Sequence, residues 1–241
     1  ATAQAVDSQG NTYVIGTYTI GILFGATSPL LTGGRPGAFV GKIKPNGEFD
    51  WTQFLTSTDG IVAGNGIAVT DQNVYIGGIF SDGTSPVFKY DPNNVGPLTN
   101  GNTFIVKLDA ATGNPVAKRT GVNNLNLNTL RLSVDGQSNV YVAGSYATDV
   151  NFGFDTPTLT TTNSAIYLYK FNQNLQYLLS TTTQGTATSI TNVDIATNSA
   201  GSSCVSATFT GGSVTLGGLT PISAVGTGTG LAARFNANLS P

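Results

Sequence analysis

An internal repeat of about 64 residues constrains the fold of this chain more than any other feature. One phrase recurs four times, as YVIGTY (13–18), YIGGIF (75–80), YVAGSY (141–146) and CVSATF (204–209). A strand-like run precedes each copy, and turns such as SQGN and GQSN, rich in Gly and Asn, join the two runs. This pattern predicts a β-hairpin in every repeat. An apolar position then recurs at a spacing of 64 residues, as Phe24, Phe88, Phe152 and Leu216.

A third strand-like run follows every hairpin, and a fourth follows three of them. The third run ends on a basic residue and one apolar residue, in AFVGKI (38–43), TFIVKL (103–108), IYLYKF (166–171) and LAARF (231–235). A fourth run follows in three repeats only, as FDWTQFLTS (49–57), NPVAKRTGV (114–122) and LQYLLSTTT (175–183). The unit is therefore four antiparallel strands, and the last copy lacks the outermost one.

Composition indicates an all-β chain. Charged residues make up 9 % of the sequence, and Gly, Thr, Asn and Ser, which suit strands and turns rather than helix interiors, are abundant. No apolar run approaches the length of a membrane span. Four-stranded repeats are typical of propeller blades, which bury both faces by packing around an axis. We predict one β-propeller domain over residues 1–241, with four blades at about 1–61, 62–126, 127–187 and 188–241.

The repeats resemble a known family. AVDSQGNTYVIGTYT, AFVGKIKPNGEFDWTQF and SVDGQSNVYVAGSYATDVNFG are similar to the bacterial β-propeller repeat labelled SBBP. The fourth copy departs from that pattern, because Cys204, Ala207 and Arg234 replace its Tyr, Gly and Lys. The resemblance implies a propeller fold and a secreted or surface-attached setting, and it implies no catalytic residues.

The fourth repeat leaves three arrangements open. In the first, which we favour, four blades close a ring in which the last blade has three strands. In the second, the chain is an arc or fragment of a longer propeller. In the third, another subunit donates the missing strand to an exposed sheet edge.

Several chemistries are excluded by residues that the chain lacks. Histidine is absent, which excludes Ser-His-Asp catalysis and most zinc or copper sites. The one cysteine, Cys204, can form no intrachain disulfide or iron–sulfur centre. Because Cys204 aligns with Tyr13, Tyr75 and Tyr141, we predict a buried, inert thiol. A net charge of −2 with scattered basic residues predicts no nucleic-acid partner and no polybasic membrane segment.

Acidic pairs could serve glycoside chemistry, but we predict that they are solvated aspartates. The pairs are Glu48 with Asp50 on the outermost strand of a blade, Asp82 with Asp91, and Asp149 with Asp155. Three further aspartates end the first strand of a repeat and are predicted to bond backbone amides of the turn, namely Asp7, Asp71 and Asp135. One carboxylate for each turn is too few to predict a calcium site.

The remaining motifs also favour structural roles. One basic residue recurs in the third run of each repeat, and these four residues form a basic column: Lys42, Lys107, Lys170 and Arg234. We predict that their aliphatic chains pack along the blade while their charged groups reach water or an acidic side chain. Trp51, the only tryptophan, could be an exposed anchor for a partner, but a blade-packing role is favoured. TGGRPG (32–37) and GTGTGLA (226–232) match no phosphate-binding loop and are predicted to be loops.

Function is therefore expected where the copies differ. The connections between second and third strands are long and dissimilar, and would gather on one face, at 19–37, 81–102, 147–165 and 210–229. The absence of Met and the start ATAQ indicate a processed, exported chain. We predict a non-enzymatic propeller without catalytic residues, cofactor or metal. It would act at a cell or particle surface as a structural, adhesion or protein-interaction module that binds a protein or its own subunits. A lectin-like, carbohydrate-binding propeller is the alternative, and a glycan-active enzyme is less favoured.

Overall fold

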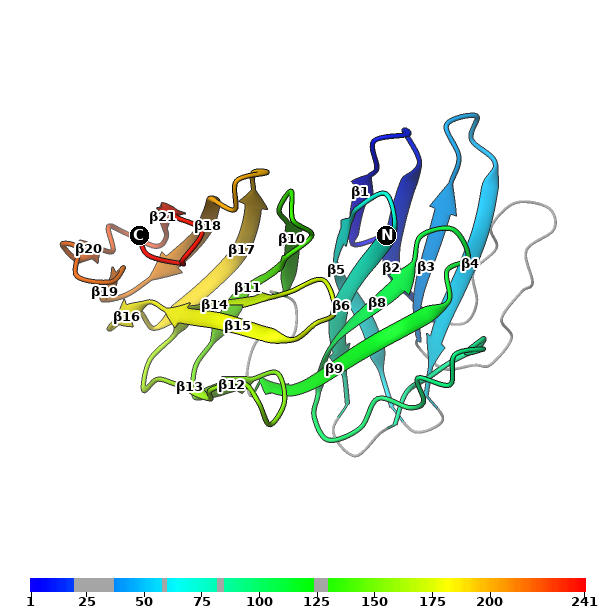
Figure 1. The fold of residues 1–241 in the computed structure, drawn as a ribbon. Coiled ribbons are helices and arrows are strands. Elements are labelled where there is room, and N and C mark those ends of the chain that lie inside the picture. Colours follow the sequence, from blue (N-terminus) through cyan, green and yellow to red (C-terminus); the bar gives the residue numbers. More distant parts are fainter. Residues whose placement is uncertain (20–36, 58–59, 82–84, 124–129) are drawn as a thin grey trace. The chain divides into compact units, whose positions relative to one another are not determined.

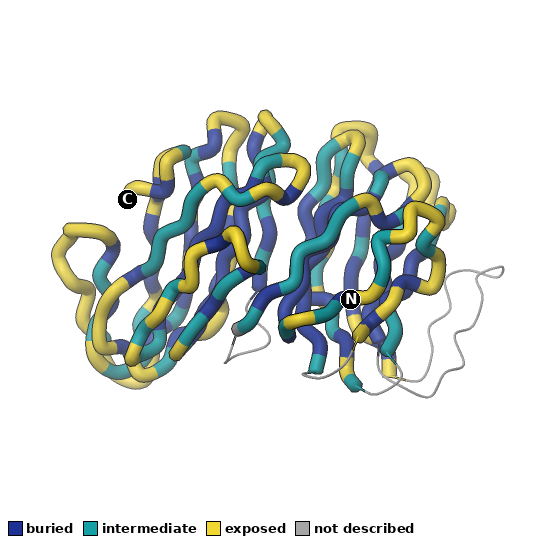
Figure 2. The backbone as a smooth tube through the Cα atoms, turned by 60° about the horizontal axis from the view of Figure 1, so that its bottom comes forward, coloured by how far each residue is buried: buried dark blue, intermediate teal, exposed yellow. Residues whose placement is uncertain are grey.

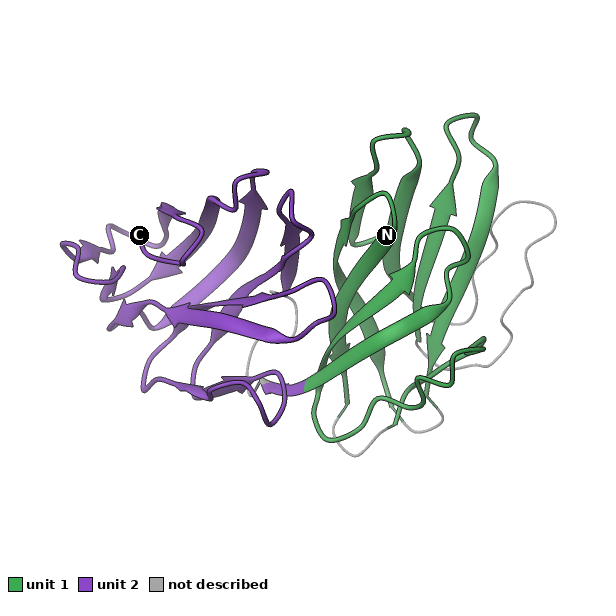
Figure 3. Cartoon of the chain, in the orientation of Figure 1, with its two compact units in different colours: residues 1–120 green, residues 121–241 purple. Residues whose placement is uncertain are grey.

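The computed structural model describes residues 1–19, 37–57, 60–81, 85–123 and 130–241. Over these residues the chain is all-β, with antiparallel strands and no helix (Figure 1). It divides into two compact units, Ala1–Thr120 and Gly121–Pro241 (Figure 3). Each unit contains two repeats. The predicted all-β class is confirmed, whereas the single domain and the four-bladed ring stay predictions.

Unit 1 contains the first two repeats. The first repeat forms adjacent strands in chain order, β1 (Ala3–Val6), β2 (Thr12–Tyr18), β3 (Gly37–Ile43) and β4 (Phe49–Thr56). The second repeat forms β5 (Val62–Val69), β6 (Asn73–Phe80), β8 (Thr103–Asp109) and β9 (Pro115–Asn123), the last of which continues into unit 2. These bounds agree closely with the sequence prediction, because alternating β-branched and aromatic residues between Gly- and Asn-containing turns favour strands.

Unit 2 contains the last two repeats. The third repeat forms a four-stranded sheet of β10 (Arg131–Val134), β11 (Val140–Tyr146), β14 (Ala165–Phe171) and β15 (Tyr177–Thr182). The fourth repeat forms a sheet of three strands, β17 (Ser189–Thr197), β18 (Ser203–Thr210) and β21 (Thr229–Phe235). In the described residues, β21 therefore has a strand neighbour on one side only.

The short apolar segments of the second, third and fourth repeats each pair with the preceding repeat. β7 (Val87–Phe88) lies beside β4, β12 (Asp149–Asn151) beside the end of β9, and β19 (Ser213–Thr215) beside β16 (Gln184–Gly185), which follows β15. The prediction that the strand of Asp50 is outermost is wrong, because β7 lies beyond β4. Two further short strands pair with two of these segments: β13 (Leu159–Thr160) lies beside β12, and β20 (Ile222–Ser223) lies beside β19. The first segment, 22–25, lies outside the described residues.

Two glycines allow these short strands to approach the preceding sheet. A Cβ atom added at Gly121 would lie 1.8 Å from the backbone oxygen of Asn151. At Gly185, which is 64 residues further along, it would lie 2.1 Å from the backbone oxygen of Ser213. No side chain fits either position, so the close contact between strands requires glycine at both.

Each unit buries its core between its two sheets. In unit 1 the core includes Ile15, Val40, Ile76, Phe104 and Val106. In unit 2 one continuous core joins the faces of the third and fourth repeats. Strands β11 and β14 are buried over their whole length. Figure 2 shows buried residues, in dark blue, mainly within strands, while many loops are exposed. Burial of apolar surface on this scale is the dominant favourable contribution to folding.

Candidate functional site

The turn aspartate of the third repeat is fully occupied by its own turn. Oδ1 of Asp135 accepts hydrogen bonds from the backbone amides of Gln137 and Asn139, both at 2.9 Å. Oδ2 accepts from Asn139 Nδ2 at 2.8 Å and from the Tyr141 hydroxyl at 3.1 Å. The predicted turn role is therefore confirmed for Asp135, and its carboxylate has four donors from within one hairpin.

Asp7 repeats this arrangement in the first repeat. It accepts from the amides of Gln9 and Asn11, from Asn11 Nδ2 and from the Tyr13 hydroxyl, at 2.8–3.1 Å. Partial burial acts to raise the pKa of Asp7, but these hydrogen bonds outweigh it and lower that pKa. The side chain is therefore a charged acceptor for its turn.

Asp71 differs from its two counterparts. Its Oδ1 accepts from the amide and the hydroxyl of Ser8, at 3.2 and 2.7 Å, and so bonds the turn of the preceding repeat. Its own turn is two residues shorter, and Thr70 Oγ1 accepts the Asn73 amide there at 3.1 Å. The prediction of a bond to its own turn is wrong for Asp71. The carboxylate of Asp7 accepts two amides of a longer turn, and the shorter turn of Asp71 offers it none.

Lys42 occupies a structural position between the two repeats of unit 1. Its Nζ atom lies 3.1 Å from Asp50 and donates to the backbone oxygen of Ala110 at 3.2 Å. It also lies over the Tyr13 ring, 5.7 Å from the centroid. Burial acts to raise the pKa of Asp50, but the ammonium groups of Lys42 and Lys44 lower it overall. Asp50 is therefore an ion-pair partner and is unsuited to act as a general acid.

Lys170 takes the equivalent position in unit 2. It donates to the backbone oxygen of Ala237 at 3.0 Å and lies 4.0 Å from Asp135. Its Nζ atom is 5.0 Å from the centroid of the Tyr141 ring. Because Ala110 and Ala237 both lie in the turn that follows a third strand, the two lysines tie neighbouring repeats together in the same way. The structural role predicted for the basic column is confirmed at these two positions.

Trp51 packs as the sequence predicted. Its ring lies 6.0 Å from that of Tyr13, and its Nε1 donates to the oxygen of Ala110 at 3.1 Å. Gly113, with a φ of +73°, leaves room for the indole, since an added Cβ would lie 2.5 Å from Trp51 Cε3.

The other carboxylates of the predicted acidic pairs lie in a turn, at the surface or on a short strand, as far as the structure describes them. Asp91 accepts the amides of Val95 and Gly96 at 2.9 and 2.7 Å, and so closes a turn. Glu48 and Asp155 are exposed and Asp149 is half-buried on β12, while Asp82 lies outside the described residues. In the part of the chain that the structure describes, no three acidic or thiol side chains gather as a metal site.

Cys204 is exposed, so the prediction of a buried thiol is wrong. Tyr13 and Tyr141 are buried because they face the next sheet of their unit. Cys204 lies on β18, in the sheet of the fourth repeat, on the face that corresponds to the one bearing Tyr141 in the third repeat. No described sheet of unit 2 covers that face. Ser206, opposite Ala232 on β21, is exposed on the same face.

Exposed aromatic side chains mark two connections between second and third strands. Phe154 is fully exposed at the turn between β12 and β13, and Tyr90 is 63 % exposed after β7. Each follows a buried phenylalanine by two residues, Phe152 and Phe88. The sequence analysis did not identify Tyr90 and Phe154, although they lie 64 residues apart, at the spacing of the repeat. The first connection lies almost wholly outside the described residues.

The fourth repeat also exposes apolar side chains in its connection. Leu219, Ile222 and Val225 are all exposed between β19 and β21. The predicted loop at 226–232 is only partly confirmed, because β21 begins at Thr229. The other glycine-rich loop, 32–37, lies outside the described residues except for Gly37.

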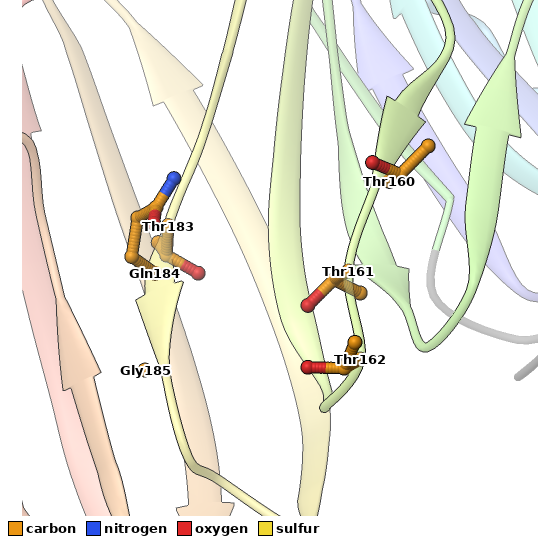
Figure 4. Close-up of a pocket in the computed structure, with 6 residues that line it drawn as sticks. All are labelled: Thr160, Thr161, Thr162, Thr183, Gln184 and Gly185. Atoms are coloured by element: carbon orange, nitrogen blue, oxygen red, sulfur yellow. The ribbon is translucent and has the colours of Figure 1, made fainter.

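A polar pocket of about 340 Å³ lies in unit 2 (Figure 4). Its lining is neutral and consists of Thr160, Thr161, Thr162, Thr183, Gln184 and Gly185. Thr183 is buried and accepts the amide of Ile166 at 2.9 Å. Asn163 Nδ2 bonds both Thr162 Oγ1 and the Gly185 oxygen. Hydroxyl and amide groups of this kind suit a neutral, polar ligand.

Among the described residues, no helix has the length and apolar character that crossing a membrane requires. The chain matches no protein-family model, and a search of curated proteins finds no relative.

Proposed function

We propose that the chain is a non-enzymatic β-propeller of four blades, built from SBBP-type repeats, that acts outside the cell or on a cell or particle surface. Its role is that of a structural, adhesion or protein-interaction module. One observation carries this proposal. The polar residues that recur, such as Asp7, Asp135, Lys42 and Lys170, bond the scaffold itself, while exposed aromatic residues project from the variable connections.

The connections supply the recognition surface in this proposal. Phe154 and Tyr90 offer large apolar area, and such side chains serve as anchors in protein interfaces. With few charges on the chain, recognition relies on apolar contact and neutral hydrogen bonds.

A biosensor panel of purified extracellular-matrix proteins tests the proposal. We expect at least one protein to bind, and the double variant Phe154→Ser/Tyr90→Ser to weaken that binding at least tenfold. Leu178→Ser is the matched control, because it removes an exposed apolar side chain from β15, outside the connections. Equal binding by the double variant would contradict the role of the connections.

The reactivity of the Cys204 thiol tests the closed propeller separately. Closure of four blades into a ring would cover the face on which Cys204 lies, which unit 2 by itself leaves exposed. We expect native Cys204 to react with a thiol reagent far more slowly than a cysteine placed at Asn238 in a Cys204→Ser background. Asn238 is an exposed turn residue at the end of the same sheet. Equal reaction rates would falsify the closed ring.

The lectin-like alternative rests on the threonine-lined pocket. A glycan array distinguishes it, since binding that is lost in Gln184→Ala and kept in Phe154→Ser would favour a carbohydrate site. Glycan hydrolysis lost in Asp149→Asn would instead favour the glycan-active enzyme.

A further inference from the structure

Three of the connections between second and third strands share one backbone hydrogen bond. In the second, third and fourth repeats, an amide late in the connection donates to the oxygen of the residue just before the short strand β7, β12 or β19. The three bonds are each 2.8 Å long and join Leu98 to Pro86, Thr161 to Thr148, and Ala224 to Gly212. Leu98, Thr161 and Ala224 therefore occupy equivalent places in their repeats.

The side chain at this place is apolar in two repeats and polar in one. Leu98 is fully buried in the core of unit 1, and Ala224 packs against the core of unit 2. Thr161 is half-buried and lines the polar pocket together with Thr160 and Thr162. An apolar side chain here would add to the core, so this run of three threonines gives up apolar burial. Positions at which a sequence departs from the packing rule of its own fold are expected to be functional.

The opposite wall of the pocket is fixed to the sheet of the third repeat. The Thr183 amide donates to the Ile166 oxygen at 3.0 Å, and the Thr183 hydroxyl accepts the Ile166 amide at 2.9 Å. The two walls are also joined, because Asn163 Nδ2 donates to the Gly185 oxygen at 3.2 Å. A pocket whose walls are held in this way is preorganised, so a ligand binds with little cost in ordering the protein.

Both walls keep hydrogen-bonding groups for a ligand. The hydroxyl oxygens of Thr161 and Thr162 accept the backbone amide and the Nδ2 atom of Asn163, both at 3.3 Å, so their hydrogens remain to be donated. These two hydroxyl groups point toward the wall that carries Gln184 (Figure 4). The side-chain amide of Gln184 is exposed and forms no hydrogen bond with a described residue.

These groups match a neutral ligand that carries several hydroxyls. Hydroxyl and amide groups of the pocket can donate and accept, as can each hydroxyl of such a ligand, so reciprocal hydrogen bonds form. None of the six lining residues is charged, so a carboxylate or phosphate that left water here would have no countercharge among them. The volume of about 340 Å³ is at the small end of the range for small-molecule sites, which suits a single ring.

We propose that this pocket binds one neutral, polyhydroxylated ring, either as a free monosaccharide or as the terminal sugar of a glycan. Thr161 and Gln184, on opposite walls, hold the ring between them. The inference goes beyond the proposed protein-interaction role and does not rest on it, because the pocket includes neither Phe154 nor Tyr90. It supplies a ligand class for the pocket on which the lectin-like alternative rests.

Titration of the full chain with monosaccharides, followed by saturation-transfer NMR, tests the proposal. We expect saturable binding of at least one of glucose, galactose, mannose and N-acetylglucosamine, and much weaker binding of glucuronic acid. A glycan array that presents the same terminal sugars distinguishes the two sources. Binding in both assays supports recognition of the free ring, and binding on the array alone supports recognition of the terminal sugar of a glycan.

The second repeat supplies the sharpest variant. Thr161→Leu copies Leu98 and should fill the pocket, so we expect sugar binding to be lost while the thermal transition stays unchanged or rises. Thr161→Val removes only the hydroxyl and should weaken binding about fivefold. Thr191→Val is the matched control, because it changes an exposed threonine on β17, outside the pocket, and should bind normally.

Absence of neutral-sugar binding in both assays overturns the proposal. Binding that Thr161→Leu leaves intact, or equal binding of glucuronic acid, overturns it as well. The double variant Phe154→Ser/Tyr90→Ser should bind sugar as the native chain does, and a loss there would contradict the assignment to this pocket. Matrix-protein binding is measured separately, so the proposed function stands or fails independently of these outcomes.

Discussion

Single residues in this chain are best understood by comparing equivalent positions. Asp7 and Asp135 accept the same four kinds of donor at nearly the same distances, although they lie in different units. A carboxylate fully engaged by its own hairpin stabilises that hairpin and has little capacity left for a ligand. Asp71, with the same place in the repeat, instead bonds Ser8 at the surface.

This difference predicts unequal costs for the same substitution. Asp135→Ala should lower the free energy of unfolding by about 3 kcal/mol, because it leaves partly buried amides and the Tyr141 hydroxyl without their charged acceptor. Asp71→Ala should cost less than about 1 kcal/mol, since its contacts are exposed. Urea denaturation of both variants measures this, and equal losses would contradict the assignment.

The sequence predicted the role of Asp135, which has a local cause, but not the exposure of Cys204, which has none. The turn role of Asp135 follows from the residues two and four positions further on, which the sequence displays. The burial of Cys204 depends on whether another sheet covers its face, and alignment with Tyr13 and Tyr141 carries no information on that.

At the level of elements, each of the first three repeats gains a short strand from the next repeat. Strands β7 and β12 join the sheets of the preceding repeats, and β19 pairs with β16, which follows the last strand of the third repeat. The boundaries of the sheets therefore differ from those of the repeats. The sequence predicted nearly all long strands, because their periodicity is local. It identified the apolar segments but not their partners, since a two- or three-residue strand has too short a pattern to specify its pairing.

Phe152 and Phe154 follow β12 and differ in burial, so we expect their substitution to have different effects on stability. Phe152 is fully buried among Tyr167, Tyr169 and Phe171, with ring centroids 5.2–6.0 Å away. Phe152→Ala should cost about 4 kcal/mol because it leaves a cavity, whereas Phe154→Ala should leave thermal and urea stability unchanged. A large loss in Phe154→Ala would mean that its side chain packs against the fold.

At the scale of the whole molecule, the chain combines a neutral surface with many buried tyrosines. Burial raises the pKa of Tyr13, Tyr75, Tyr141 and Tyr169, that of Tyr75 to about 12. The four-bladed ring stays a prediction, because a period of 64 residues specifies the repeat, whereas the number of blades in a ring depends on packing angles between sheets.

These tyrosines predict loss of stability in alkali. A tyrosine whose pKa is raised by folding stabilises the native state fully below its unfolded pKa of 10.0, and this contribution declines as the pH rises toward the folded value. The melting temperature should therefore fall between pH 10 and 12. In acid, Asp7 and Asp50, whose pKa values folding lowers, should lose their contribution as the pH falls below 3.8.

Between these limits the melting temperature should vary little, since the chain has no histidine to titrate near neutrality. Differential scanning calorimetry from pH 3 to 12, with tyrosinate absorbance recorded in parallel, measures both effects. A flat profile above pH 10 would contradict the burial of the tyrosines.

The pairing of each short strand with the preceding repeat also affects how the chain emerges from the ribosome. Thr56 ends β4, but its partner Val87 is synthesised about 30 residues later, which takes roughly 2–6 s at ordinary translation rates. During that interval the growing sheet has an open edge, and a similar delay follows the second and third repeats. The nascent chain therefore folds in overlapping stages, each completed by residues of the next repeat.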